Sequence, residues 1–315
     1  MITRCLNCKT MMMRNVNKIL FFMLFAGLLH TVHAQRATRL LLEDWKFSQV
    51  DTEAAQLTRF NDGNWRVLDI PHDWSIEGNF AKEHASTFNQ GALPTGIGWY
   101  RKHFKLTAAA SSKHVQLNFD GVFQRSDVWI NGHYLGRHNN GYVSFKYDIS
   151  KYLNKTGDNV IALRVDNSAQ PNSRWYTGSG MYRKVWLDLS SQTFIDPSDL
   201  FVHAKVEKNG ATAVEISAMV SNFSGQQKNL KLIHEIHDAR GKLVAKGDPI
   251  SLSLLNGKKP VNGVVKIANP VLWSPASPYL YQSVVKIYEK VCWLIRFKQH
   301  WESGILDLMR TMVSP

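Results

Sequence analysis

Cysteine is scarce in this chain of 315 residues, which has three in all and none between residues 35 and 290. A protein of this length with so few cysteines is not a disulfide-stapled scaffold. Cys5 and Cys8 have the spacing of a metal or redox pair, but translation from one of residues 11–13, each a methionine, would leave them out. We therefore expect no disulfide framework and no cysteine-based site.

Runs of one charge sign are also missing. The formal net charge is +13, with 38 Lys and Arg against 25 Asp and Glu, yet no five like charges follow one another. Proteins that bind nucleic acid usually gather their bases in one stretch or on one face. We therefore interpret the basic balance as a solvated surface and expect no nucleic-acid partner.

The chain has one notable apolar run, from Ile19 to Leu29, and it is too short to span a bilayer about 30 Å thick. The bases Arg14 and Lys18 precede it, and small residues stand at the first and third positions before Gln35. This order is typical of a secretory signal peptide. We predict that residues 1–34 are removed and that the protein is secreted or periplasmic, with no membrane contact after cleavage. An uncleaved anchor is the alternative.

Alternating apolar and polar residues dominate the rest of the chain. Val115, Leu117 and Phe119 alternate with polar neighbours, and Asn131-Gly132 separates two apolar runs, which is a strong hairpin signal. No helical pattern extends past about ten residues before the last 25 positions. Residues 37–192 are therefore predicted to form an all-β domain whose size suits a two-sheet jelly roll.

A second block of strand-like segments follows the break at Asp196-Pro197. About 95 residues in short strands is the size of an immunoglobulin-like sandwich, although the cysteine pair of antibody domains is missing. We predict such a sandwich over residues 197–290, with strands at residues 200–206, 213–220, 230–237, 264–267 and 280–288.

Several stretches of this sequence resemble glycoside hydrolase family 2, and in particular its β-galactosidases. The resemblance to the amino-terminal domain rests on IPHDWSIEG (70–78), GWYRKHF (98–104), FDGV with VWING (119–132), and the segment 165–183, which ends in SRWYTGSGMYR. NPVLWSPASPYLY (269–281) is similar to the end of the second domain in that family. The resemblance implies a galactose-binding-like jelly-roll β-sandwich followed by an immunoglobulin-like β-sandwich.

Five residues are predicted to bind substrate. Aromatic rings suit the apolar faces of sugars, and charged side chains suit their hydroxyls. In the family the first domain lends loop residues to a sugar pocket, and Asp73 falls where β-galactosidases place a polar side chain that contacts galactose. The predicted residues are Asp73, Trp74, Arg174, Trp175 and Tyr176.

A structural interpretation of the same residues stays open. The aromatic residues could fill the sandwich core, and Arg174 could pair with Asp166. For Trp99, Trp129 and Trp186, which lie within strand patterns, we expect a place in the core. Some relatives carry an acid near the position of Arg174 that helps hold a sodium ion. Its replacement here argues against a metal, and we expect no metal and no cofactor in this chain.

The resemblance also implies an activity and a partner. Retaining glycosidases need two carboxyl groups about 5–5.5 Å apart. In this family both are glutamates on a (β/α)8 barrel that follows the second sandwich, so no catalytic residue is assigned. We expect the amino-terminal part of a glycosidase acting on a β-galactoside or related oligosaccharide, inactive by itself. The alternatives are a secreted carbohydrate-binding module and a structural fragment that forms homo-oligomers.

The segment 291–315 does not read like the family. After a one-base slip, Cys292-Trp293 must encode leucine and Trp301-Glu302 must encode glycine, which fits the passage into the family's barrel. We therefore hypothesise a frameshift near residue 290. A tail of this origin would lack evolved packing partners, so we expect it to be sticky or disordered.

Overall fold

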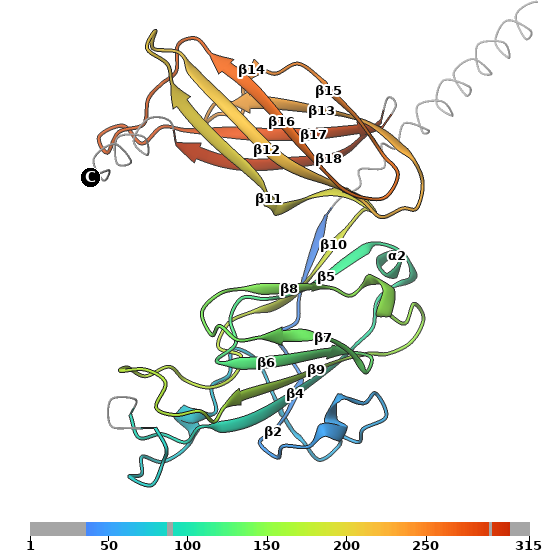
Figure 1. Cartoon of the computed structure of the whole chain (residues 1–315), viewed down its shortest axis with the longest axis vertical. Coiled ribbons are helices and arrows are strands. Elements are labelled where there is room, and N and C mark those ends of the chain that lie inside the picture. Colours follow the sequence, from blue (N-terminus) through green and yellow to red (C-terminus); the bar gives the residue numbers. More distant parts are fainter. Residues whose placement is uncertain (1–35, 87–90, 290–291, 303–315) are drawn as a thin grey trace, which may run out of the picture.

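The computed structural model describes residues 36–86, 91–289 and 292–302, which form two β-rich parts that follow each other along the chain (Figure 1). The predicted signal peptide (residues 1–34) and the end of the predicted tail lie outside the described residues. Within that part of the chain no helix is long and apolar enough to cross a membrane. The helices are short: η1 (Glu53–Gln56), η2 (Ser75–Glu77), α2 (Ala108–Ser111) and η4 (Ser150–Tyr152).

The first part is a sandwich of two antiparallel sheets. One sheet has the strand order β1-β10-β5-β8, and the other has the order β3-β2-β4-β9-β6-β7. This two-sheet architecture confirms the predicted fold class. The strands are β1 (Ala37–Leu40), β2 (Trp45–Ser48), β3 (Arg66–Leu68), β4 (Gly96–Phe104), β5 (His114–Phe119), β6 (Arg125–Ile130), β7 (His133–His138), β8 (Phe145–Asp148), β9 (Asn159–Asn167) and β10 (Val185–Ser190).

The alternation of the sequence builds the core of this sandwich. Val115, Leu117 and Phe119 of β5 are fully buried, and so are Val128 and Ile130 of β6 on the facing sheet. Successive side chains of a strand point to opposite faces, so each sheet sends one apolar set inward. The core therefore lies between the two sheets.

The predicted hairpin is also present. Asn131 and Gly132 have φ angles of 51° and 81°, and Ile130 pairs directly with His133 across them. Two consecutive left-handed residues are what a type I′ turn requires. The amide of Asn131 donates to the Tyr152 carbonyl oxygen at 2.8 Å, which ties the turn to the neighbouring loop.

The expected core position is found for Trp99, which is 1% exposed but lies in a small outer cluster, and not for Trp129 or Trp186, which are half-buried. Trp99 is followed by the inward-facing Tyr100, and Trp129 lies between two inward-facing residues of β6. Trp99 belongs instead to a small outer cluster against which Trp129 packs, and Trp186 donates its indole N–H to Asp120 at 2.9 Å. The strand period of two places all three on the outer faces of the sheets.

The second part is another antiparallel sandwich. Its sheets have the orders β11-β12-β16 and β14-β13-β17-β18, with β15 also paired to β13. All five predicted strand segments lie within observed strands. The bounds are β11 (Thr193–Val206), β12 (Thr212–Asn222), β13 (Lys228–His237), β14 (Leu243–Lys246), β15 (Ile250–Leu254), β16 (Gly257–Ile267), β17 (Leu280–Glu289) and β18 (Cys292–Glu302).

The Asp196-Pro197 break lies inside β11 and coincides with a register shift between Ile195 and Leu200. Lys146 of the first sandwich bonds to Asp196 at 2.7 Å. Burial alone would raise the pKa of Asp196, but hydrogen bonds from Lys146 and Ser198 outweigh it and hold that pKa well below its usual range. An ionised carboxylate at the bulge thus links the two sandwiches.

The backbone of residues 292–302 forms β18, which pairs antiparallel with β17. The exposed edge of β17 offers free backbone groups, and an extended segment can satisfy them whatever its side chains. The expectation of disorder is therefore wrong for these residues. The frameshift hypothesis concerns the nucleotides and stays a prediction.

Candidate functional site

Three segments that are far apart in the sequence meet at one end of the first sandwich. The backbone of residues 72–74 hydrogen-bonds to that of residues 179–181 at 2.8 and 3.1 Å. On the other side, Gly180 and Phe123 exchange two backbone hydrogen bonds, both of 2.8 Å. The loop that follows β9 is therefore held between the segment 72–74 and Phe123.

Two glycines make this close approach feasible. Gly180 has φ = 116°, and a Cβ there would overlap the Tyr100 hydroxyl and lie 2.9 Å from the His72 carbonyl oxygen. Gly178 has φ = 71°, and a Cβ there would lie 2.5 Å from Asp73 Oδ2. Only glycine combines these dihedral angles with this lack of space.

Asp73 is the polar centre of this end of the sandwich. Its Oδ1 accepts hydrogen bonds from the backbone N–H groups of Ser75 at 3.0 Å and Ser179 at 2.8 Å. Its Oδ2 accepts the hydroxyl of Tyr176. Burial, together with the adjacent Asp73 carboxylate, raises the pKa of Tyr176 well above its usual value, so its hydroxyl remains a donor. The carboxylate is thus fixed in one orientation.

His72 supports this loop from inside. Its Nε2 lies 3.0 Å from Arg66 Nη2, and its Nδ1 lies 2.7 Å from the Tyr100 hydroxyl. The Arg66 guanidinium can only donate to Nε2, whereas the Glu77 carboxylate, 3.3 Å from the same nitrogen, can only accept from it, so both neighbours hold this side of the ring. Burial lowers the pKa of His72, although the nearby Glu77 carboxylate acts to raise it. The burial thus favours the neutral ring.

Asn167 holds the other side of the loop. It is the buried last residue of β9, and its amide donates to the Gly178 carbonyl at 3.0 Å and to Ser179 Oγ at 2.8 Å. Its Oδ1 accepts the amide of Asn172 at 2.8 Å. Ser75 Oγ donates to Ser179 Oγ at 2.7 Å. One buried amide thereby links the end of β9 to the backbone beside Asp73.

Aromatic side chains form an exposed rim next to this centre. Trp175 is 60% exposed and donates its indole N–H to the Tyr142 hydroxyl at 3.1 Å. The Tyr142 ring meets Phe123 edge to face, with centroids 5.5 Å apart. Tyr176 is 43% exposed. Rings that are exposed yet held by hydrogen bonds are suited to stacking against a ligand.

The structure treats the five predicted site residues differently. It brings Asp73 and Tyr176 into contact. It places Trp175, the residue before Tyr176, on the exposed rim. Trp74 is 2% exposed and packs against Phe47 in the core, so the prediction that its ring stacks on a sugar is wrong. The packing fixes the backbone on both sides of Asp73 instead.

Arg174 is exposed, and among the described residues no hydrogen bond or ion pair is found for it. The open alternative, that it pairs with Asp166, is wrong. Asp166 binds Arg125 at 3.2 Å and lies 3.6 Å from Arg164. Sequence reasoning missed Tyr142, which lies in the loop between β7 and β8 and has no motif of its own. Only the fold brings it to Trp175.

The arrangement can bind a polyhydroxylated ligand. A carboxylate has about four acceptor positions, and the three hydrogen bonds to Asp73 within the described chain leave room for a ligand hydroxyl. Asp73 is the one carboxylate that accepts a hydrogen bond from Tyr176 among the described residues. Among the described residues no three His, Cys, Asp or Glu side chains are grouped as for a metal ion.

Comparisons with known proteins agree with this architecture. The family described as "Glycosyl hydrolase 2 galactose-binding domain-like" matches residues 96–218, and "Glycosyl hydrolases family 2" matches residues 193–293. A β-galactosidase of Bacteroides ovatus is 38% identical over 244 residues, which cover 78% of this chain and 29% of that protein. A β-glucuronidase of Formosa agariphila is 29% identical over 278 residues, which cover 81% of this chain and 28% of that protein.

Solved structures give the same result. The crystal structure of a β-glycosidase from Bacteroides vulgatus superposes with a TM-score of 0.74 at 34% identity, and the match covers 84% of this chain and 34% of that one. The chain therefore spans between 28% and 34% of the length of these three proteins.

Proposed function

Because the chain belongs to glycoside hydrolase family 2, through its galactose-binding-like and sandwich domains, we propose that it forms the amino-terminal part of a β-galactosidase-type enzyme. Its role there is to present the loop site of the first sandwich to a β-galactoside. The relatives include a β-galactosidase and a β-glucuronidase.

One observation carries the proposal, and it is the fixed Asp73 carboxylate. Two backbone N–H groups and the Tyr176 hydroxyl orient it, while the residue stays partly exposed. A hydrogen bond from a sugar hydroxyl to a carboxylate is worth about 1.5–3 kcal/mol, more than one between neutral groups. Because Asp73 is already oriented, little of this is lost to ordering on binding.

The aromatic rim adds an apolar surface to this polar contact. Trp175 and Tyr142 form a hydrogen-bonded pair of exposed rings at the same end of the sandwich. Sugar rings have apolar C–H faces that pack on such surfaces. In the proposed enzyme, a barrel that follows the two sandwiches supplies both catalytic carboxylates. The role proposed for the two sandwiches is therefore to hold the sugar, and the role proposed for the barrel is to cleave it.

The enzyme is proposed to work outside the cytoplasm. The support is the sequence pattern of residues 14–34, in which two bases, a short apolar run and small residues occur in the order that a signal peptidase recognises. Oligosaccharides too large to cross the inner membrane freely would then meet the enzyme where they arrive.

A chimera tests the role of the loop site. Residues 36–289 replace the matched part of the Bacteroides ovatus β-galactosidase, and kcat/KM is measured with a chromogenic β-galactoside. Asp73→Asn keeps an oxygen for the two backbone N–H groups but removes the charge. We expect it to lower kcat/KM by about 10–100-fold, since a charged hydrogen bond is lost.

The matched control is Asp248→Asn, which removes an exposed carboxylate from the second sandwich. It should leave kcat/KM within about twofold, as is usual for exposed positions away from such features. If Asp73→Asn behaves like this control in a folded chimera, Asp73 does not contact the sugar and the proposal fails.

A further inference from the structure

A second pocket lies on the outer face of the six-stranded sheet, away from the loop site. Its volume is about 580 Å3, within the range of about 300–1,000 Å3 of small-molecule sites. Trp99 lines this pocket, whereas the next residue, Tyr100, points into the core and contacts His72. Successive residues of a strand face opposite sides, so the sheet itself separates the pocket from the loop site.

Aromatic rings form one wall of the pocket. The rings of Trp99 and Trp129 are stacked, with centroids 5.4 Å apart and planes inclined by 24°. The Tyr134 ring lies 5.3 Å from Trp129 and is 52% exposed. The three residues come from β4, β6 and β7, and the ladder fixes their spacing. Trp99 is 1% exposed and supports the wall from below, whereas Trp129 is half-buried and Tyr134 is exposed, so these two rings form the apolar surface that a ligand can reach.

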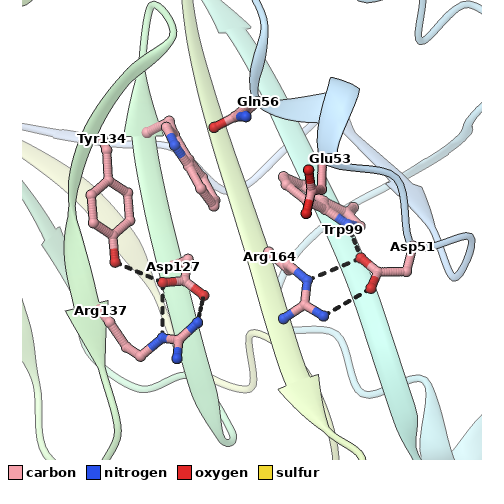
Figure 2. A pocket seen from close by; sticks show the side chains of 9 residues that line it. Asp51, Glu53, Gln56, Trp99, Asp127, Tyr134, Arg137 and Arg164 are labelled. Atoms are coloured by element: carbon pink, nitrogen blue, oxygen red, sulfur yellow. Dashed lines mark hydrogen bonds and ion pairs between the residues drawn. The ribbon is translucent and has the colours of Figure 1, made fainter.

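Charged side chains line the pocket as closed pairs. Arg164 makes a two-pronged contact with Asp51 at 2.9 and 2.8 Å, and Arg137 makes one with Asp127 at 3.0 and 2.7 Å (Figure 2). The hydrogen bond from Arg164 lowers the pKa of Asp51 although burial opposes it. The Asp51 carboxylate is therefore ionised at neutral pH, and within each pair one acid faces one base.

The net charge of the side chains that line the pocket opposes the binding of an anionic ligand. With Glu53, three carboxylates face two guanidiniums, which leaves the pocket with one net negative charge. Figure 2 shows Glu53 and Gln56 on one side of the pocket and the two arginine pairs on the other. Such a site offers many hydrogen-bond donors and acceptors beside an aromatic wall and no excess positive charge.

We propose that this pocket is a second carbohydrate-binding site, which takes a neutral hexose disaccharide or a longer oligosaccharide on the rings of Trp129 and Tyr134, with the buried Trp99 holding Trp129 in place. A sugar offers an apolar C–H face and a rim of hydroxyls, and the pocket has the complement of each. The site holds a carbohydrate chain and performs no chemistry. It is independent of the loop site and would bind whether or not the proposed enzyme role holds.

The rim of the pocket is rigid before any ligand arrives. Arg101 is completely buried, and it donates to Asp62 at 2.7 Å, to the Leu57 carbonyl at 3.1 Å and to the Ala55 carbonyl. These contacts anchor η1, which carries Glu53 and Gln56 into the pocket. A preformed rim loses little conformational entropy on binding.

The experiment is ligand-observed NMR and calorimetry on the full chain. The probes are lactose, β-1,4-galactobiose, cellobiose and a disaccharide that contains glucuronic acid. We expect saturable binding of at least one neutral disaccharide in the millimolar range or tighter. The uronic acid disaccharide should bind no more tightly than the neutral ones.

Two variants remove the aromatic wall, and a third is the matched control. Tyr134→Ala and Trp129→Ala should each weaken binding by about tenfold, the effect of losing one aromatic contact. The control Phe201→Ala removes an exposed ring, 67% against 52%, from the second sandwich and should leave the affinity within twofold. Tyr142→Ala removes a ring from the rim of the loop site and tells which of the two sites holds the sugar.

Three results would overturn the proposal. They are no saturable binding of any of the four probes, binding unchanged in both Tyr134→Ala and Trp129→Ala, or a uronic acid disaccharide bound ten times more tightly than the neutral ones. Binding lost in Tyr142→Ala alone would assign the sugar to the loop site and also refute the pocket. Circular dichroism of each variant shows whether it is folded.

Discussion

Replacing Gly180 with alanine tests how the loop site is built. Gly180 is the residue where the loop after β9 passes between the His72 backbone and Phe123. An alanine Cβ would overlap the buried Tyr100 hydroxyl, lie 2.9 Å from the His72 carbonyl oxygen and lie 3.1 Å from Trp74 Cε3. None of these atoms is the end of a flexible surface side chain, so the backbone must move.

The loss of folding free energy caused by Gly180→Ala has two parts. A side chain at φ = 116° adds backbone strain of about 1–3 kcal/mol. The overlap with Tyr100 and His72 adds a further overpacking cost of about 1–3 kcal/mol. Gly96 separates the two, because its φ is 109° and nothing lies within 4 Å of a Cβ there. Gly96→Ala therefore carries the first part without the second.

The assay is guanidinium unfolding of both variants, followed by tryptophan fluorescence. Most of the ten tryptophans lie in the first sandwich, so the signal reports on the domain that holds both glycines. We expect Gly180→Ala to be about 1–3 kcal/mol less stable than Gly96→Ala, equivalent to a melting temperature lower by about 3–10 °C. Equal stability of the two variants would refute the close approach of the three segments.

Three further predictions concern separate features of the chain. Arg101→Met should destabilise the first sandwich by about 3 kcal/mol, because it leaves Asp62 buried with His103 alone; a cost under about 1 kcal/mol in denaturant unfolding would contradict this. Burial lowers the pKa of His234 from 6.5 to about 4, so the unfolded chain binds the proton more tightly. The second sandwich should then lose about 3 kcal/mol as pH falls from 6.5 to 4, and His234→Gln should flatten that profile; an unchanged profile would exclude His234 as its source. Mass spectrometry of the secreted protein should find Gln35 as the first residue, and an intact residue 1 in the exported protein would contradict signal cleavage.

Much of the fold could be predicted from local pattern. The alternation in Val115, Leu117 and Phe119 and the turn residues Asn131 and Gly132 each depend on a few adjacent positions. The physics that acts on them is local too, since strand period and turn dihedrals are set by neighbours in sequence. The same alternation of inward- and outward-facing residues could also have predicted where the side chains of Trp99 and Trp129 point. The parity of the inward-facing residues assigns both tryptophans to the outer face.

The site could be predicted in part. Asp73 and Tyr176 stood out because they occur in loop-like contexts, yet 103 positions separate them, and only the packing of the loops makes them partners. The burial of Trp74 could not be read from its motif. Asp73 and Trp74 are neighbours in one loop, and only the packing of that loop decides which of the two side chains faces the core. No sequence motif indicated the second pocket. Its lining residues are spread along the chain, because β4, β6, β7, β9 and η1 each contribute only one or two of them.

The central claim is that these two sandwiches are the sugar-facing, non-catalytic part of a family 2 glycosidase. The most direct measurement compares release of the chromophore from a β-galactoside by the chain alone, by the Bacteroides ovatus enzyme without its matched part, and by the chimera of the two. The account predicts no hydrolysis by the chain alone, little by the truncated enzyme, and restored hydrolysis by the chimera. Hydrolysis by the purified chain of 315 residues, or a truncated enzyme as active as the chimera, would contradict it.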